Sequence, residues 1–417
     1  MSKLKEIKDN LEIYKAEIQK RGLQLDVEKI IADNEKRIEL QTEIETLRAE
    51  QNKSSKKDIS ADEISKLKEL KEQIKEKQAK LDEWQKKANN LAAKIPNITK
   101  DDVPVGKDEK DNVVVKEWGK KKDFKFPAQD HVALGKILDG LDMVKAAEVS
   151  GSRFYYLKND LARLEMALIN HAIDFVNKKS FEFVMPPILV REDAMYGTGF
   201  FPAEKNEIYN VNPADDNLFL IGTSEVSLAS LHKNDILDKN ELPKKYAAFS
   251  PCFRREAGSY GKDTKGIYRV HQFNKVEMFM YVDPEKSWDT HEELIKLSEE
   301  FIESLEIPYR TVNCCSGELS MTSAKRYDIE AWMPGRGSYG EVGSTSNTTD
   351  YQTKRLGIKT TNEKGEKVYC HTMNSTVMAA PRYIIAILEN NQQADGSVVI
   401  PKVLQKYMNL KKLESQK

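Results

Sequence analysis

The segment from Val27 to Leu91 contains neither glycine nor proline, and this limits what the chain can fold into more than any other feature. Without the two residues that most often end helices, the segment favours continuous helix. Its second half places apolar residues on a heptad seam, with Lys77 as the single polar interruption, at Leu67, Leu70, Ile74, Leu81, Trp84, Ala88 and Leu91. The first half has a weaker seam at Ile30, Leu40, Ile44 and Leu47. Such seams predict helices that pack along one shared face.

A break in this pattern divides the segment into two helices. The stretch QNKSSKKDIS has no apolar periodicity, and Ser60 with Glu63 forms a capping box that restarts the second helix. The sequence therefore predicts an antiparallel helical hairpin whose arms, of about 26 residues each, extend roughly 39 Å into solvent. Taken alone, a hairpin of this kind is more often a dimerising or spacer coiled coil than an RNA-binding element.

A second region of mixed α/β pattern follows the hairpin. Pro96 ends the second helix, and the polar linker DDVPVGKDEKDN leads to a larger core that begins near Asn112. We therefore expect two domains, residues 1–100 and residues 101–417.

The larger region opens with a helix and an interrupted strand. An apolar stripe predicts a helix from Asp160 to Lys178, and FEFVMPPILV follows as a strand that Pro186 and Pro187 interrupt. This pattern by itself is typical of a buried core helix beside an edge strand.

The stretch FRREAGSYGKDTKGIYRVHQFNKVEM, from Phe253 to Met278, sets arginines, carboxylates and one aromatic along two predicted strands. The first strand spans 246–253, and Gly258, Gly261 and Gly266 supply turn conformations in the charged loop that follows. On the return strand, alternation sends one set of side chains to the core, namely Val276, Met278, Met280 and Val282. The opposite face then carries Phe273, Lys275 and Glu277.

The polar face of this return strand predicts a pocket for two substrates. Phe273 and Glu277 lie roughly 13 Å apart along an extended strand, which suits a base at one end and a small charged substrate at the other. The ordinary alternative is an exposed hairpin whose charged face is simply solvated.

Three more segments combine apolar strands or helices with polar turns. FLIGTS is an apolar strand opening into a turn followed by Glu225, although TSE alone is more often a helix cap. GRGSYGEVGSTSNTTDYQTKR packs small and hydroxyl residues around Glu341, and its alternative is a flexible surface loop. HTMNSTVMAAPRYIIAILENNQ predicts a strand running into an apolar helix, with Pro381 in its first turn and Arg382 at its N-terminus, where an anion is favoured.

In this order along the chain, the segments resemble class II aminoacyl-tRNA synthetases. The helix with the PP strand is similar to motif 1, the Phe253–Met278 stretch to motif 2, and the Pro381 segment to motif 3. The form of motif 2, with TSE ahead of it, resembles the seryl-tRNA synthetase family in particular. The resemblance implies an α+β fold, with an antiparallel sheet flanked by helices and an N-terminal antiparallel coiled-coil arm over about residues 27–91. It also implies a homodimer formed through the motif 1 helix and strand.

The resemblance assigns residues to two substrates. Serine would be held by Thr223, Ser224, Glu225, Arg254, Glu277 and Thr376. ATP would be held by Arg254, Arg255, Glu256, Val270, Phe273, Glu341, Val342, Gly343, Ser344 and Arg382. Among these, Arg254 would meet the α-phosphate and the serine carboxylate, Phe273 would stack on adenine, and Glu256 would meet its amino group. Glu341 and Ser344 would bind Mg²⁺, because hard oxygen donors suit this ion.

Two details qualify this assignment. Asn347 and Arg355 are expected to support the Mg²⁺ site. Where many bacterial members have a glycine-rich NGSG stretch, this chain has the stiffer series Asn374, Ser375, Thr376 and Val377. Thr376 stands where the family places a hydroxyl that contacts serine.

The resemblance implies an ATP-dependent enzyme that joins serine to tRNA. It would form seryl-adenylate and pass the seryl group to the 3′ end of tRNA-Ser, whose long variable arm the helical hairpin would hold. Lys53, Lys56 and Lys57 near the hairpin tip are candidate RNA contacts. Charging of a selenocysteine tRNA, and editing of threonine, are left open.

Composition adds limits to this interpretation. The net charge of −1 gives no global attraction to nucleic acid, so RNA contacts must come from local patches. The charged N-terminus and the lack of long apolar runs predict a cytoplasmic protein. The cysteines lack CxxC spacing, which predicts buried reduced thiols without a metal, at Cys252, Cys314, Cys315 and Cys370.

Two rival functions stay compatible with parts of the sequence. A related enzyme could pass its activated amino acid to a carrier protein, although such an enzyme has little use for a tRNA-holding arm. A scaffold that assembles through the coiled coil would bind no nucleotide, and the set Arg254, Glu256, Glu341 and Arg382 argues against it.

Overall fold

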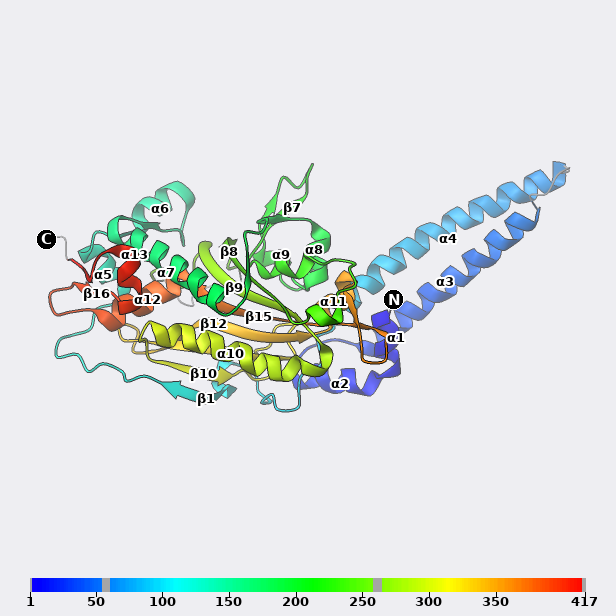
Figure 1. The fold of residues 1–417 in the computed structure, drawn as a ribbon. Helices are drawn as coiled ribbons and strands as arrows, with labels where there is room; N and C mark the ends of the chain where they lie inside the picture. Colours follow the sequence, from blue (N-terminus) through cyan, green and yellow to red (C-terminus); the bar gives the residue numbers. More distant parts are fainter. Residues whose placement is uncertain (1, 55–60, 258–264, 415–417) are drawn as a thin grey trace. The chain divides into compact units, whose positions relative to one another are not determined.

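Two compact units make up the chain, one from Met1 to Ile98 and the other from Thr99 to Lys417 (Figure 1). The computed structural model describes residues 2–54, 61–257 and 265–414. Within these ranges no helix is long and apolar enough to cross a membrane.

The first unit is entirely helical. Its elements are α1 (Ser2–Asp9), α2 (Leu11–Lys20), α3 (Val27–Ser54) and α4 (Ala61–Ala93). The two long helices, α3 and α4, run side by side in opposite directions, which confirms the predicted helical arm (Figure 1). With 28 and 33 residues they are longer than expected. Lys77, the polar interruption of the seam, pairs with Glu43 across the two helices, with 2.5 Å between Nζ and Oε2.

Burial along the hairpin is deepest near its base. There Val27, Ile30, Ala88 and Ala92 join side chains of α1 and α2 in a small apolar core. Farther along the rod, Ile44 and Leu70 of the predicted seam are buried and its other residues are half-buried, because the flanks of a two-helix rod meet water. The capping box at Ser60 and the tip lysines Lys56 and Lys57 lie outside the described residues.

An eight-stranded sheet forms the centre of the second unit, in the order β1-β10-β11-β12-β15-β9-β8-β4. The bounds, in that order, are Val113–Trp118, Tyr309–Asn313, Lys325–Met333, Ser338–Thr349, His371–Ala379, Gln272–Val282, Lys244–Phe253 and Glu182–Val184. All neighbours are antiparallel except β4 and β8. The predicted antiparallel sheet and its two-stranded hairpin, β8 and β9, are therefore confirmed.

Helices and small sheets surround this sheet. The helices are α5 (His131–Ile137), α6 (Met143–Ser150), α7 (Asn159–Lys178), α8 (Glu192–Thr198), α9 (Glu225–Ser230), α10 (Ser287–Ser304), α11 (Tyr351–Leu356), α12 (Ala380–Asn391) and α13 (Lys402–Met408). One small sheet joins β5 (Leu189–Val190), β7 (Leu218–Leu220) and β6 (Asn210–Val211). Three strand pairs complete the unit: β2 (Leu141–Asp142) with β3 (Tyr156–Leu157), β13 (Lys359–Thr361) with β14 (Lys367–Tyr369), and β16 (Val398–Val399) with β17 (Lys412–Leu413).

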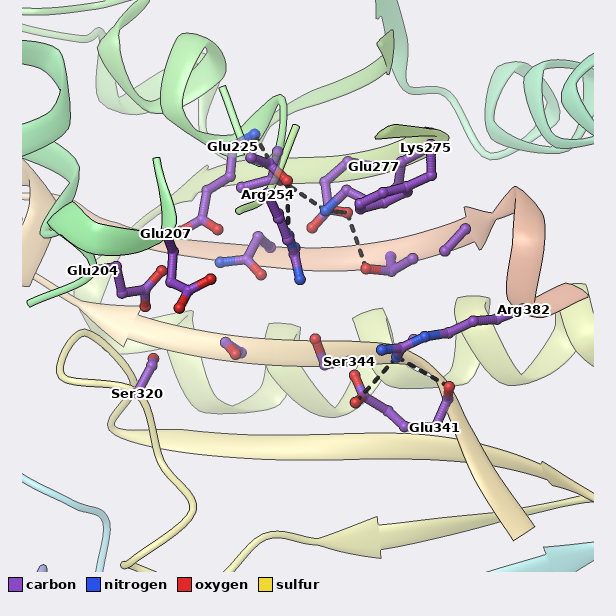
Figure 2. A pocket seen from close by; sticks show the side chains of 18 of the residues that line it. Glu204, Glu207, Glu225, Arg254, Lys275, Glu277, Ser320, Glu341, Ser344 and Arg382 are labelled. Carbon is purple, nitrogen blue, oxygen red and sulfur yellow. Dashed lines mark hydrogen bonds and ion pairs between the residues drawn. The ribbon is translucent and has the colours of Figure 1, made fainter. Parts of the chain in front are cut away.

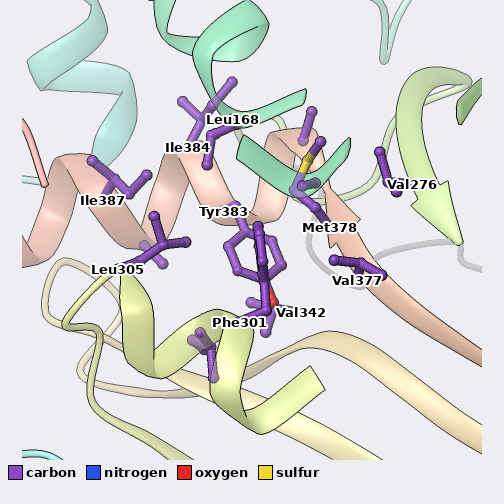
Figure 3. Close-up of a cluster of buried hydrophobic side chains, with 14 of the residues drawn as sticks. Leu168, Val276, Phe301, Leu305, Val342, Val377, Met378, Tyr383, Ile384 and Ile387 are labelled. Atoms are coloured by element: carbon purple, nitrogen blue, oxygen red, sulfur yellow. The ribbon is translucent and has the colours of Figure 1, made fainter. Parts of the chain in front are cut away.

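One face of the large sheet carries the main core. Helices α7, α10 and α12 bury their apolar stripes against it, and Figure 3 shows Phe301 and Tyr383 meeting among side chains from all three elements and the sheet. The predicted inward set of β9 belongs to this core, because alternate side chains of a strand face one side. Burial of each large apolar side chain contributes about 1.5–3 kcal/mol, so this face holds the sheet together. On the opposite face, a second apolar cluster that includes Phe279 and Tyr281 covers part of β8 and β9, and Lys275 and Glu277 project from the same face of β9.

Pro186 and Pro187 separate two strands that belong to different sheets. β4 ends before them and pairs with β8, whereas β5 begins after them and pairs with β7. Proline has no N–H for a ladder, so the chain leaves the large sheet here.

Candidate active site

A cavity of about 550 Å³ opens on the polar face of the large sheet. Strands β9, β11, β12 and β15 form its floor, and the turn before α9 and the segment around Glu204 form its rim (Figure 2). The site is therefore assembled from segments that are widely separated in the sequence.

Strand β9 sends Phe273, Lys275 and Glu277 into this cavity, as the alternation predicted. Oε2 of Glu277 accepts hydrogen bonds from two donors. Lys275 Nζ lies 2.7 Å from it and Thr376 Oγ1, on the neighbouring β15, lies 3.0 Å from it. Thr376 and Glu277 are direct cross-strand partners, so the sheet register sets this contact.

The TSE segment is divided between the cavity and the interior. Thr223 and Glu225 line the cavity, but its described wall does not include Ser224. Ser224 is fully buried, and its hydroxyl makes no capping bond to α9. The helix-cap interpretation therefore fails for the Ser224 hydroxyl, whereas Thr223 Oγ1 accepts from the backbone N–H of Glu225, the first residue of α9, at 3.2 Å. The implied serine contact of Ser224 has no support from its position.

Glu225 has an unusual charge environment. Its Oε1 accepts a hydrogen bond of 2.8 Å from Gln352 Nε2. Burial, with a smaller contribution from the nearby Glu277 carboxylate, raises the pKa of Glu225 to about 7. Its charge state therefore changes within the ordinary working range of pH.

Arg254 stands where the motif 2 hairpin enters the cavity. Its Nε donates to the carbonyl of Gly222 at 3.2 Å, and its guanidinium lies 5.3 Å from the ring centre of Phe273. Arg255, by contrast, is not part of the described cavity wall, and its backbone N–H donates to the carbonyl of Glu207 at 2.8 Å. Successive side chains of an extended segment diverge, which explains why the two arginines separate.

The motif 2 loop is anchored where it returns to β9. Gly258 and Gly261 lie outside the described residues, whereas Gly266 has φ +77° and passes against the His131 ring, where a Cβ atom would lie 1.9 Å from Nε2. The next residue, Ile267, directs its N–H to the same Nε2 at 3.3 Å. Glycine is therefore required at 266 by its conformation and by its surroundings.

Arg382 and Glu341 form an ion pair at the other end of the cavity (Figure 2). Arg382 Nη1 lies 3.1 Å from Oε2 of Glu341 and donates to its backbone carbonyl at 3.0 Å. Burial opposes ionisation of Glu341, but the guanidinium groups of Arg382 and Arg326 outweigh it and lower the pKa of this carboxyl. Arg382 belongs to the first turn of α12, and its guanidinium lies 4.7 Å from the ring centre of Tyr268.

A bulge in β12 places Glu341 and Ser344 on the same side. Ile329 pairs with Gly343 and Glu330 with Glu341, so Val342 is an extra residue whose side chain enters the core. In a regular strand, two residues three positions apart, such as Glu341 and Ser344, face opposite sides of the sheet. The extra residue of the bulge brings them to the same side. The segment is a strand, so the alternative of a flexible loop is wrong.

The donor atoms at this end fit Mg²⁺. A carboxylate and a hydroxyl, from Glu341 and Ser344, are hard oxygen ligands, and Mg²⁺ commonly combines one or two such groups with water and substrate phosphates. Within the described ranges no cluster of three or more His, Cys, Asp or Glu side chains could hold a metal by itself. The site therefore suits an ion that arrives with a phosphate ligand.

The other expected support residues lie away from the cavity. Asn347 Nδ2 donates to Ser287 Oγ at 2.9 Å beneath the sheet, and Arg355 Nη1 donates to the carbonyl of Tyr351 at 2.9 Å. Neither belongs to the described cavity wall. The cysteines are all buried and free, and none of them lines the described cavity: Cys252, Cys314, Cys315 and Cys370.

Several cavity residues were not found from the sequence. They are Glu204, Glu207, Tyr268, Arg269, Ser320, Thr322, Ser323, Arg326, Ser346 and Asn374. Tyr268 and Arg269 lie within the motif 2 match, and their position just before Val270 was a usable signal. The remaining residues come from connections and strands whose spacing carries no pattern, so only the fold brings them to the site.

The fold and the site together define a class II aminoacyl-tRNA synthetase. Residues 208–391 match the family described as the tRNA synthetase class II core domain (G, H, P, S and T). Residues 1–99 match the seryl-tRNA synthetase N-terminal domain.

Whole-chain relatives narrow the class. The serine–tRNA ligase of Pyrococcus horikoshii is 45% identical over 99% of this chain and 97% of its own length. The crystal structure of seryl-tRNA synthetase from the same organism, complexed with ATP, gives a TM-score of 0.87 at 42% identity and covers 99% of both chains. The crystal structure of the cytoplasmic serine–tRNA ligase of Naegleria fowleri, in complex with AMP, gives a TM-score of 0.82 at 34% identity. It covers 97% of this chain and 96% of the Naegleria chain. The chain belongs to the seryl-tRNA synthetase family, which confirms the resemblance, the fold class and the type of enzyme expected from the sequence.

Proposed function

We propose that this protein is an ATP-dependent serine–tRNA ligase. The observation that carries this proposal is one cavity with two chemically different ends. Glu277, with its partners Lys275 and Thr376, offers a small polar subsite, and Arg382 with Glu341 offers a phosphate subsite. Arg254 and Phe273 line the same cavity, 5.3 Å apart from guanidinium to ring centre.

At the polar end, Glu277 and Thr376 hold the serine hydroxyl, and Glu225 receives its ammonium group beside the Thr223 turn. Carboxylates and small hydroxyls match a small zwitterion better than an apolar pocket does. Discrimination against threonine would depend on the room left beside Thr376, where one more methyl group would collide.

At the nucleotide end, Phe273 stacks on adenine and Glu256 accepts from its amino group, while Arg382 binds the outer phosphates. The serine carboxylate attacks the α-phosphorus and pyrophosphate leaves, which gives seryl-adenylate. The 3′-terminal ribose hydroxyl of tRNA then attacks the seryl carbonyl and AMP leaves. Because the carboxylate is already ionised near neutral pH, positioning and charge neutralisation by Arg254 and Arg382 do most of the work.

Glu341 and Ser344 would hold Mg²⁺ in this reaction. When bound, the ion would neutralise phosphate charge. Without it, the carboxylate of Glu341 keeps Arg382 in place, as the 3.1 Å ion pair indicates.

The domain before residue 100 would hold tRNA-Ser, and the domain after it would hold the small substrates. The length of α3 and α4 supports this division, because duplex RNA is recognised mainly through shape and backbone phosphates. Lys53 is the described candidate near the tip. The cytoplasm, where tRNA is charged for translation, is the proposed location.

A homodimer belongs to the same proposal. The exposed apolar side chains Tyr156 and Met166 line one groove between β3, α6 and α7, and Val144 and Val149 of α6 are exposed as well. Several exposed apolar side chains on neighbouring elements are typical of an interface. A second copy would cover them.

Met166→Glu is expected to convert the dimer into a monomer. Met166 is 57% exposed, so the change costs little inside one chain but would bury a charge at the interface. Light scattering after size exclusion measures the mass of each form. Val105→Glu, at a 72% exposed valine outside this groove, is the matched control. A monomeric wild-type protein would refute this interface.

ATP–pyrophosphate exchange with a panel of amino acids, with and without Mg²⁺, tests the activation step. Exchange that requires serine and Mg²⁺ is the expected result. Exchange with a different amino acid would reject the serine assignment while keeping the class II chemistry. No exchange with any amino acid would favour the scaffold alternative.

Activity should depend on pH through Glu225. Its pKa of about 7 means that the carboxyl is mostly neutral at pH 6 and mostly ionised at pH 8. Only the ionised form attracts the serine ammonium, so kcat/KM for serine should rise about tenfold from pH 6 to pH 8. Glu225→Gln should remove this rise, and the KM for ATP should stay flat over the same range. A flat serine profile in the wild type would contradict the role of Glu225.

A further inference from the structure

Lys275 is a buried cation in the cavity wall, and the steps above do not require it to touch either substrate. Its side chain is only 7% exposed, and lysine is almost never buried without a partner. Its Nζ lies 2.7 Å from Thr223 Oγ1 and 2.7 Å from Glu277 Oε2. The bond to Thr223 joins the turn before α9 to strand β9, and the pair with Glu277, drawn in Figure 2, lies within β9.

The ion pair between Lys275 and Glu277 controls the orientation of the Glu277 carboxylate. Oε2 accepts from both Lys275 and Thr376, the latter at 3.0 Å. No described residue donates to Oε1. The two donors on Oε2 fix the plane of the carboxylate, and Oε1 is the acceptor that remains for a substrate.

Electrostatics gives a second reason for a cation at this position. The nearby Glu277 carboxylate raises the pKa of Glu225, and the Lys275 ammonium opposes this effect. Removal of the ammonium would leave two carboxylates facing one small cavity. Two carboxylates in this situation take up a proton or move apart. Either change would disturb Oε1 of Glu277 as an acceptor for the substrate.

We propose that Lys275 is a positioning residue that selects for the hydroxyl of the amino acid. It holds Thr223 and Glu277 at a fixed separation and directs Oε1 toward the substrate side chain. Serine satisfies this oxygen, whereas alanine leaves a buried acceptor without a donor, which a polar site rejects strongly. The inference rests on the proposed serine–tRNA ligase function and adds the group that sets its specificity.

The test compares Lys275→Met with the wild-type protein in ATP–pyrophosphate exchange, with serine and with alanine. Methionine keeps the apolar stem and removes the charge. We expect kcat/KM for serine to fall about 30-fold and that for alanine to change by less than about threefold, because alanine never used the oriented oxygen. The serine-to-alanine ratio should therefore fall about tenfold or more, while the KM for ATP stays unchanged.

Lys325→Met is the matched control for loss of a buried lysine. Lys325 is 3% exposed and pairs with Asp102 at 2.8 Å and with Glu292 at 3.3 Å, but it does not belong to the described cavity wall. The Lys325→Met variant should lose thermal stability as Lys275→Met does. It should keep the wild-type ratio of kcat/KM for serine to kcat/KM for alanine. Lys275→Gln, which retains a donor without the charge, serves if the methionine variant does not fold.

The outcomes separate the inference from the function it rests on. The positioning role alone is overturned if a folded Lys275 variant keeps the wild-type ratio of kcat/KM for serine to kcat/KM for alanine. It is also overturned if Lys325→Met lowers this ratio as much as Lys275→Met does. Absence of serine-dependent exchange in the wild-type protein overturns the proposed function, and the inference with it.

Discussion

Arg254→Lys should lose most adenylate formation, with kcat for ATP–pyrophosphate exchange lowered about 10²–10³-fold. Its guanidinium lines the cavity and lies 5.3 Å from the ring centre of Phe273. A planar guanidinium can bind two oxygens at once, whereas an ammonium is a point charge that cannot reproduce this geometry. Steady-state exchange with saturating serine and ATP measures the effect.

Arg255→Lys is the control that the chain itself supplies. The two arginines are adjacent and equally charged, but the described cavity wall includes only Arg254. We expect Arg255→Lys to change exchange by less than about threefold, as for substitutions away from a site. Near-normal exchange in Arg254→Lys would remove Arg254 from the mechanism. A large loss in Arg255→Lys would restore the ATP contact that the family resemblance implies for it.

Shortening the arm should abolish tRNA charging and spare amino acid activation. The structure locates the cut, because Arg37 Nη1 lies 3.1 Å from Gln85 Oε1 across α3 and α4. Removing residues 38–84 and closing the gap with a short glycine-containing turn keeps the apolar core at the hairpin base, which includes Val27 and Ala88. We expect charging of tRNA-Ser to fall at least about 10²-fold, since the phosphate contacts of the arm are lost.

Two measurements on the same preparation decide this prediction. Exchange with serine should stay within about twofold of the wild type, because every residue of the described cavity wall lies after residue 198. Transfer of radiolabelled serine to tRNA should be lost. If both half-reactions survive the cut, the acceptor is not held by the arm, and a carrier protein becomes the better candidate.

The sequence was sufficient for elements whose pattern is local. The seam from Leu67 to Leu91 predicted α4, and alternation along β9 predicted that Phe273 and Glu277 share a face. Both results follow from the fixed periods of helix and strand, which need no knowledge of the neighbours. Family resemblance added the order of the motifs, and with it the class of enzyme.

Local pattern failed where the site depends on neighbours. Ser224 and Arg255 follow the motif, yet the described cavity wall excludes both of them. Glu204 and Arg326 carry no motif and line the cavity. Whether a side chain near a turn faces a cavity depends on how the turn packs against strands far away in the sequence.

What the sequence by itself determined was the helical arm, the hairpin of β8 and β9, and the family. Tertiary structure alone decided the two relations on which the chemistry depends. The bulge at Val342 turned Glu341 and Ser344 to one side, and packing of the TSE turn on β9 brought Thr223 to Lys275. The physical reason is that periodicity fixes direction within one element, whereas distances between elements are set by register and by the core that holds the sheet.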